Sequence, residues 1–169
     1  RDLVRSRGLG DVYKRQENDI LAYIQPVFVD LDMNTVEPAI GTHRMEGIYA
    51  WKTMLDLGIH ASGGSDAPVV SFDAMENIYF AVTRKNINGE PKEGWIPSER
   101  LTVDETVKLF TKYAAYASYT EDENGTIETG KNADFVVLEK DIYEINPDEI
   151  KTTKVDMTIL GGETVFERK

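Results

Sequence analysis

The sequence predicts an α/β protein in which strands and helices alternate, followed by a small antiparallel sheet. A near-continuous apolar run at 20–29 is typical of a strand buried on both faces of a parallel sheet. Apolar residues at helical spacing follow this run, and a second short strand and a second helix come after them. After Tyr119 the pattern changes to short strands and tight turns, which indicates the antiparallel part.

Local signals justify the first elements in turn. The first strand is expected to end or bulge near Pro26, because proline cannot donate to a strand ladder. We expect a loop at 33–41 and then a helix over 43–57, where apolar residues recur at helical spacing and Gly58 supplies the stop. The second strand is predicted at 59–62.

Two further helices are predicted after that strand. A helix at 72–83 has Ser71 or Asp73 as a plausible cap, and a loop follows at 87–94. The next helix begins at a capping box, in which the side chains of Thr102 and Glu105 satisfy backbone N–H groups at the helix start. Its apolar stripe comprises Val103, Val107, Phe110, Ala114 and Ala117.

The C-terminal part is predicted to be a small sheet. Asn146 and Pro147 indicate a single helical turn. Gly161 and Gly162 fit a two-residue hairpin turn between two strands. The expected strands lie at 126–127, 134–138, 155–160 and 164–166.

Composition narrows the class of protein. The chain has 169 residues, 41% of them hydrophobic, which suffices for a buried core. A net charge of −11 argues against binding to nucleic acid and to an anionic membrane surface. The absence of cysteine fits a reducing compartment, and no apolar stretch is long enough to span a membrane, so we expect a cytoplasmic protein.

Residues 1–16 differ from the rest of the chain. They are basic in an acidic protein and show neither helical nor strand periodicity. Their end resembles a recurrent artefact of sequence assembly. We expect a non-native leader, with a basic disordered arm as the alternative.

Asp66 is the candidate functional residue. It lies in a glycine-rich run at 63–69, directly after the second predicted strand. Enzymes of the α/β class place catalytic or metal-binding carboxylates at such strand exits. Asp in a turn before a helix also caps that helix, so a structural role for Asp66 stays open.

The sequence offers few partners for a metal at Asp66. The only two histidines are His43 and His60, and no His-x-His or cysteine pair exists. A catalytic zinc takes about three protein ligands, so a complete metal site is not expected within this chain. His60 is predicted to pack or hydrogen-bond as a strand side chain, and His43 to be a surface residue at a helix start. Ser65 does not lie in a nucleophile elbow, and the run 63–65 lacks the P-loop pattern.

Four runs, taken in order, resemble one known family. They lie at 22–28, at 55–69, at 81–84 with 100–102 and 114–117, and at 125–138. Together they resemble the C-terminal portion of the metal-dependent amidohydrolase superfamily. The resemblance is closest to amidohydrolase family 3, the branch that includes N-substituted formamide deformylases.

The resemblance implies a fold and a division of the chain. Members of the superfamily have a TIM (β/α)8 barrel and a β-sandwich built from both chain ends. Residues 17–120 are therefore expected to be the last strand–helix units of the barrel, and residues 121–169 part of the sandwich. A truncated barrel would leave an apolar sheet edge open, which is an aggregation hazard.

The resemblance also implies a chemistry. The family holds one or two divalent metals, commonly zinc, and hydrolyses carbon–nitrogen bonds of small amide-type substrates. Asp66 matches the aspartate that ends the last barrel strand, which contacts the metal or its water and shuttles the proton. The other family ligands are expected upstream of this chain, and no ligand role is carried onto His43 or His60. The isolated chain is therefore expected to be inactive, and no oligomeric state is predicted.

A rival interpretation needs no upstream part. In it the chain is a self-contained small α/β binding module, and Asp66 is a structural helix cap. The glycine-rich turn would then hold an anionic group at the N-terminus of a helix.

Overall fold

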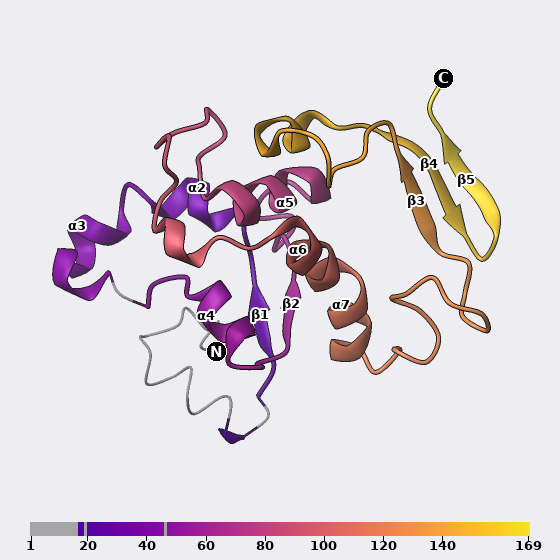
Figure 1. Ribbon diagram of the computed structural model, residues 1–169, viewed down its shortest axis with the longest axis horizontal. Coiled ribbons are helices and arrows are strands. Elements are labelled where there is room, and N and C mark those ends of the chain that lie inside the picture. The colour runs from indigo at the N-terminus through magenta and orange to yellow at the C-terminus, as the bar shows by residue number, and fades with distance from the viewer. Residues whose placement is uncertain (1–16, 19, 46) are drawn as a thin grey trace.

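The computed structural model describes residues 17–18, 20–45 and 47–169. The leader predicted at 1–16 lies outside the described residues. Figure 1 shows a pair of parallel strands among helices, with a separate three-stranded sheet beside them. Among the described residues, no helix combines the length and the apolar character that a membrane crossing requires.

The parallel pair confirms the predicted α/β arrangement. Strand β1 (Ala22–Ile24) pairs with β2 (Ala61–Gly63) in parallel, with Ala22 opposite Ala61 and Ile24 opposite Gly63. The crossover between them is helical. It comprises α2 (Phe28–Asp32), α3 (Val36–Ile40), a 3-10 turn (Thr42–Arg44) and α4 (Trp51–Asp56).

The strand in the apolar run 20–29 ends at Ile24, close to Pro26 where an end or a bulge was predicted, and the rest of the run enters α2. Two other boundaries in this region were predicted wrongly. The loop expected at 33–41 contains α3. The helix expected over 43–57 begins only at Trp51, although Gly58 stops it as predicted, with a φ of 77°.

The helices after β2 follow the cap signals closely. Helix α5 (Ala74–Thr83) is capped by Asp73, whose carboxylate accepts from the N–H groups of Met75 and Glu76. Helix α6 (Val103–Phe110) begins at the predicted capping box. The prediction of a single helix is wrong, because the helix breaks at Thr111 before α7 (Lys112–Ala117). The Thr111 hydroxyl donates back to the Val107 carbonyl at 2.8 Å, a bond that bends helices.

The antiparallel sheet matches most of its prediction. Strands β3 (Phe135–Leu138), β4 (Val155–Leu160) and β5 (Glu163–Glu167) lie in the order β3-β4-β5. Gly161 and Gly162 form the hairpin turn with φ values of 58° and 83°. Asn146 caps a 3-10 turn (Pro147–Thr152) as expected. The strand expected at 126–127 is absent from this described part of the chain, which is irregular there.

Two apolar clusters form the core, and α5 contributes to both of them. The first joins the parallel strands to α4 and α6 through residues such as Ile24, Trp51 and Leu109. The second joins α5 to the Pro147–Thr152 turn through Tyr79, Phe80 and Ile150. The β3–β5 sheet contributes only the partly buried Leu138 to these clusters.

A fully buried arginine connects the segments around the first cluster. Arg84 follows α5 with a left-handed φ of 57°, and its guanidinium donates to the carbonyls of Trp95 at 3.0 Å and Tyr49 at 3.2 Å. It also lies 4.5 Å from the centre of the Trp51 ring. Burial lowers the pKa of Arg84 to about 10, and the attraction of Glu99 opposes this shift only in part.

Candidate active site

Asp66 lies where the sequence places it, at the carboxyl end of β2. Because β1 and β2 are parallel, the segments that follow them, beginning at Gln25 and Gly64, leave the same edge of the sheet. The Gly64 N–H donates to the Ile24 carbonyl at 2.9 Å, which joins the two segments directly. Helix α5 then begins beyond Asp73, so residues 64–73 form the loop that carries Asp66.

Two glycines stand where β2 passes into this loop, and they differ in role. A side chain on Gly63 would place its Cβ 2.8 Å from the Phe110 ring, because α6 packs directly onto β2 at this point. Gly63 is therefore required by packing. The space beside Gly64 is open, but its N–H is already bonded to Ile24. Gly63 and Gly64 are thus both used in packing or hydrogen bonding within the fold, and the run does not form a binding site for an anion.

Asp66 itself has an unusual backbone. Its φ is 63°, in the left-handed region that L side chains rarely adopt. The turn is closed by the Val69 N–H, which donates to the Asp66 carbonyl at 2.9 Å. The Ala67 N–H donates to the Ser65 hydroxyl at 3.3 Å. Both bonds leave the Asp66 carboxylate unused. That side chain is exposed and has no hydrogen-bond or ion-pair partner among the described residues.

The interpretation of Asp66 as a helix cap is wrong. The cap of α5 is Asp73, seven positions further along the chain, which accepts from Met75 N–H at 2.8 Å. This carboxylate occupies the first free amides of α5 and places negative charge there. The helix N-terminus is therefore not open to an anionic ligand, and the rival binding module loses the feature on which it depended.

The fit of a metal ion can be judged from the donors present. Within residues 17–18, 20–45 and 47–169, no three His, Asp or Glu side chains lie together in a group that could hold a metal ion. The free carboxylate of Asp66 is a suitable single ligand. The described part of the chain therefore offers one ligand and does not form a metal site by itself.

Neither histidine forms part of a metal-binding group with Asp66 among the described residues. His43 is exposed in the Thr42–Arg44 turn, although the helix predicted to start there begins later. The His60 ring packs 4.7 Å from the Tyr116 ring and 6.0 Å from the Tyr113 ring. His43 is thus a surface residue and His60 packs against aromatic rings, as was predicted for each of them.

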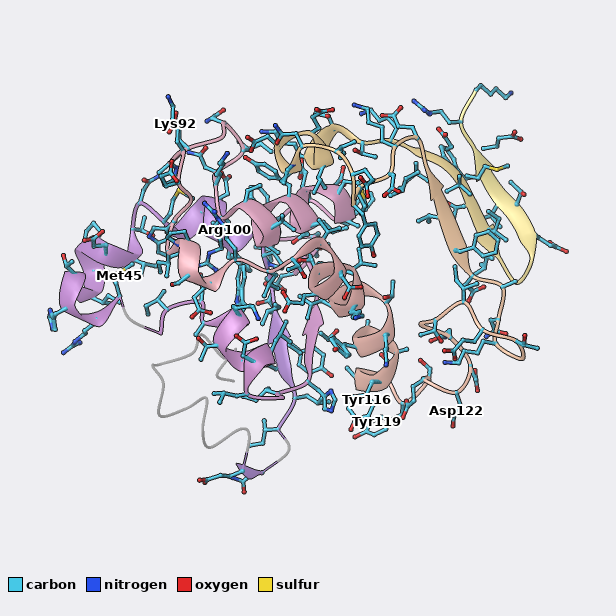
Figure 2. All side chains as sticks on the ribbon, viewed as in Figure 1. Met45, Lys92, Arg100, Tyr116, Tyr119 and Asp122 are labelled. Atoms are coloured by element: carbon cyan, nitrogen blue, oxygen red, sulfur yellow. The ribbon has the colours of Figure 1, made fainter. Side chains whose placement is uncertain are left out.

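One cavity of about 230 Å³ lies at the other end of α5, beside Thr83. Ten residues of helix, about 15 Å, separate that end from the Asp66 loop. Lys92 and Arg100, labelled in Figure 2, belong to its lining. Arg100 already donates to the Thr83 carbonyl at 3.3 Å, and Lys85 is paired with Asp148 at 2.8 Å. This cavity is therefore not part of the Asp66 site.

The sequence did not point to Asn77, which is 1% exposed in the first turns of α5. Its side-chain oxygen accepts from the Val27 N–H at 3.2 Å. Its side-chain nitrogen donates to the Asp73 carbonyl at 2.9 Å. The available signal was a polar residue directly before the mainly apolar run at 78–82.

Comparison with known proteins places the chain in a family. A model of the Amidohydrolase family matches residues 18–166, so the chain belongs to that family. The YtcJ protein of Bacillus subtilis is 37% identical over 145 residues, or 86% of this chain. The N-substituted formamide deformylase of Arthrobacter pascens is 33% identical over 121 residues, or 72% of this chain. The chain spans only about a quarter of these relatives, 27% and 22% of their lengths.

Solved structures agree on the fold. A metal-dependent hydrolase from Pyrococcus horikoshii matches 82% of this chain and 28% of its own, with a TM-score of 0.72 and 17% identity. The guanine deaminase of E. coli matches 98% of this chain and 38% of its own, with a TM-score of 0.67 and 17% identity. The chain therefore carries strand–helix units of the amidohydrolase TIM barrel, as the resemblance implied.

Proposed function

We propose that the whole protein carrying this chain is a metal-dependent hydrolase of carbon–nitrogen bonds other than peptide bonds. An amide or formamide is the proposed substrate, because a relative at 33% identity is named N-substituted formamide deformylase. The observation that carries the proposal is the unpartnered, exposed carboxylate of Asp66 at the exit of β2, in a chain of the Amidohydrolase family. Its left-handed backbone supports a functional role, because such strain clusters at active sites.

Asp66 has a definite part in this chemistry. A divalent metal, commonly zinc in this family, supplies water activation when bound, and its remaining ligands come from outside the described residues. The Asp66 carboxylate takes a proton from the attacking water and later delivers it to the leaving nitrogen, which departs as an amine. A carboxylate with no competing hydrogen bond is suited to both transfers.

Replacement of the carboxylate tests the proposal. The whole protein, with zinc added, is assayed against a panel of amides and N-formyl amines. We expect turnover by the wild type and a loss of about 100-fold or more in Asp66→Asn, because the amide cannot take up the proton. The control is Asp122→Asn, an exposed aspartate that Figure 2 shows beyond α7.

Two results would contradict these expectations. Turnover by Asp66→Asn at the wild-type rate would remove the role assigned to the carboxylate. The second would contradict the expected inactivity of the 169-residue chain alone, which follows from the single metal ligand that its described residues offer. Hydrolysis by that chain, abolished in Asp66→Asn, would show that a complete site exists within it.

A further inference from the structure

The loop that carries Asp66 is attached at both ends to the same short segment. At its start, the Gly64 N–H donates to the Ile24 carbonyl at 2.9 Å. At its end, Asp73 is bonded to the side chain of Asn77, which in turn binds the Val27 N–H at 3.2 Å. Ile24 is the last residue of β1, and Val27 lies three positions further on, in the turn that follows the strand.

That turn is held by hydrogen bonds of its own, so it can serve as a fixed point to which the loop is attached. The Phe28 N–H donates to the Gln25 carbonyl and the Val29 N–H to the Pro26 carbonyl, both at 3.1 Å. Val27 is 7% exposed, and Asn77 is the acceptor found for its N–H. Buried backbone N–H groups are rarely left without a partner, so this bond is costly to lose.

We infer that Asn77 is a positioning residue for Asp66. It clamps the N-terminus of α5 to the turn after β1, and residues 64–73 are thereby held between two fixed points. The inference rests on the proposed function, since it assigns Asn77 to the geometry of that site. Misplacement of a catalytic group by about 1 Å can lower a rate by about 100-fold. Loss of the clamp should therefore act on kcat more than on KM.

The test compares two asparagines at opposite ends of α5. Asn77→Ala removes both clamp bonds. Asn77→Asp keeps the oxygen that accepts from Val27 but loses the donor to the Asp73 carbonyl, so it removes one of the two bonds. Asn86→Ala is the matched control, because the Asn86 side chain likewise makes two hydrogen bonds to the backbone, accepting from Asn88 N–H at 3.0 Å and Glu90 N–H at 2.9 Å.

The first readout is amide hydrogen exchange of residues 64–73 in the whole protein, which does not depend on turnover. We expect exchange to rise about tenfold or more in Asn77→Ala, to rise less in Asn77→Asp, and to stay at the wild-type rate in Asn86→Ala. The second readout is turnover by the whole protein. We expect kcat to fall about tenfold to 100-fold in Asn77→Ala, with KM within about threefold of the wild type.

The two proposals fail in different ways. If the wild-type whole protein hydrolyses none of the amides, the proposed function fails, and the exchange data still decide the role of Asn77 as a clamp. If the wild type is active and Asn77→Ala keeps the kcat of the Asn86→Ala control, the inference is overturned. It is equally overturned if exchange in residues 64–73 does not distinguish Asn77→Ala from Asn86→Ala.

Discussion

Asp66 has a left-handed backbone and an exposed side chain. The effect of a substitution on backbone strain can therefore be measured separately from its effect on catalysis. Left-handed φ costs an L side chain about 1 kcal/mol, and glycine escapes this cost because it lacks a Cβ. We expect the free energy of unfolding of Asp66→Gly to be about 1 kcal/mol higher than that of Asp66→Ala, measured by urea denaturation. Both variants of the whole protein should be inactive. Equal stability of the two would show that the conformation at residue 66 is unstrained.

Arg84 joins three segments through one planar cation. Lysine would keep the charge, but it cannot donate in the same fixed geometry to the Trp95 and Tyr49 carbonyls or stack as well on Trp51. We expect Arg84→Lys to lower the free energy of unfolding by about 2 kcal/mol, measured by urea denaturation. The exposed Arg44→Lys is the control and should change it by less than about 0.5 kcal/mol. An equal effect in both variants would contradict this role for Arg84.

The capping box of α6 predicts a dependence of stability on pH. Burial raises the pKa of Glu105, but hydrogen bonds from Thr102 and Lys52 outweigh burial and lower it below its ordinary value of 4.5. The stabilisation by Glu105 is therefore complete above that value and disappears as the pH falls through the lowered pKa. We expect Glu105→Gln to cost about 1 kcal/mol near neutral pH and progressively less in acid. Urea denaturation as a function of pH measures this, and a cost independent of pH would contradict it. The exposed Glu123→Gln serves as control.

The elements that were predictable from the sequence are those fixed by local chemistry. The Asp73 cap, the capping box at Thr102 and the Gly161–Gly162 turn each depend on residues within a few positions of one another. The break at Thr111 was missed because a threonine hydroxyl can face solvent or bond backwards, and periodicity does not decide between them.

The same distinction applies to the site. The place of Asp66 after a strand was readable from the sequence, whereas the clamp joins residues 50 positions apart and has no local pattern. The local pattern offered Ser71, Asp73 and Asp66 as possible caps, and the start of α5 at Ala74 decides in favour of Asp73.

Among the described residues, the β3–β5 sheet has an apolar face that is only partly covered, since Phe135 and Val137 on it are exposed. Phe135 and Val137 lie directly opposite Ile159 and Met157, so these four side chains share a face. Strands β3–β5 pack chiefly on one another, and Leu138 is the residue of this sheet that packs against the core of the helical part. In the whole protein we expect other strands to cover this face, in the sandwich built from both chain ends that the family resemblance implies.

The isolated chain should therefore associate with copies of itself through this face. Val137→Lys places a charge among Phe135, Met157 and Ile159, and burial of that charge in a sheet-to-sheet contact is unfavourable. Val136→Lys is the matched control, because its side chain points to the opposite face, beside Thr158. In sedimentation velocity we expect the wild type and Val136→Lys to associate as concentration rises, and Val137→Lys to remain monomeric. Association of Val137→Lys to the wild-type extent would show that another surface, such as the open edge of β1, drives it.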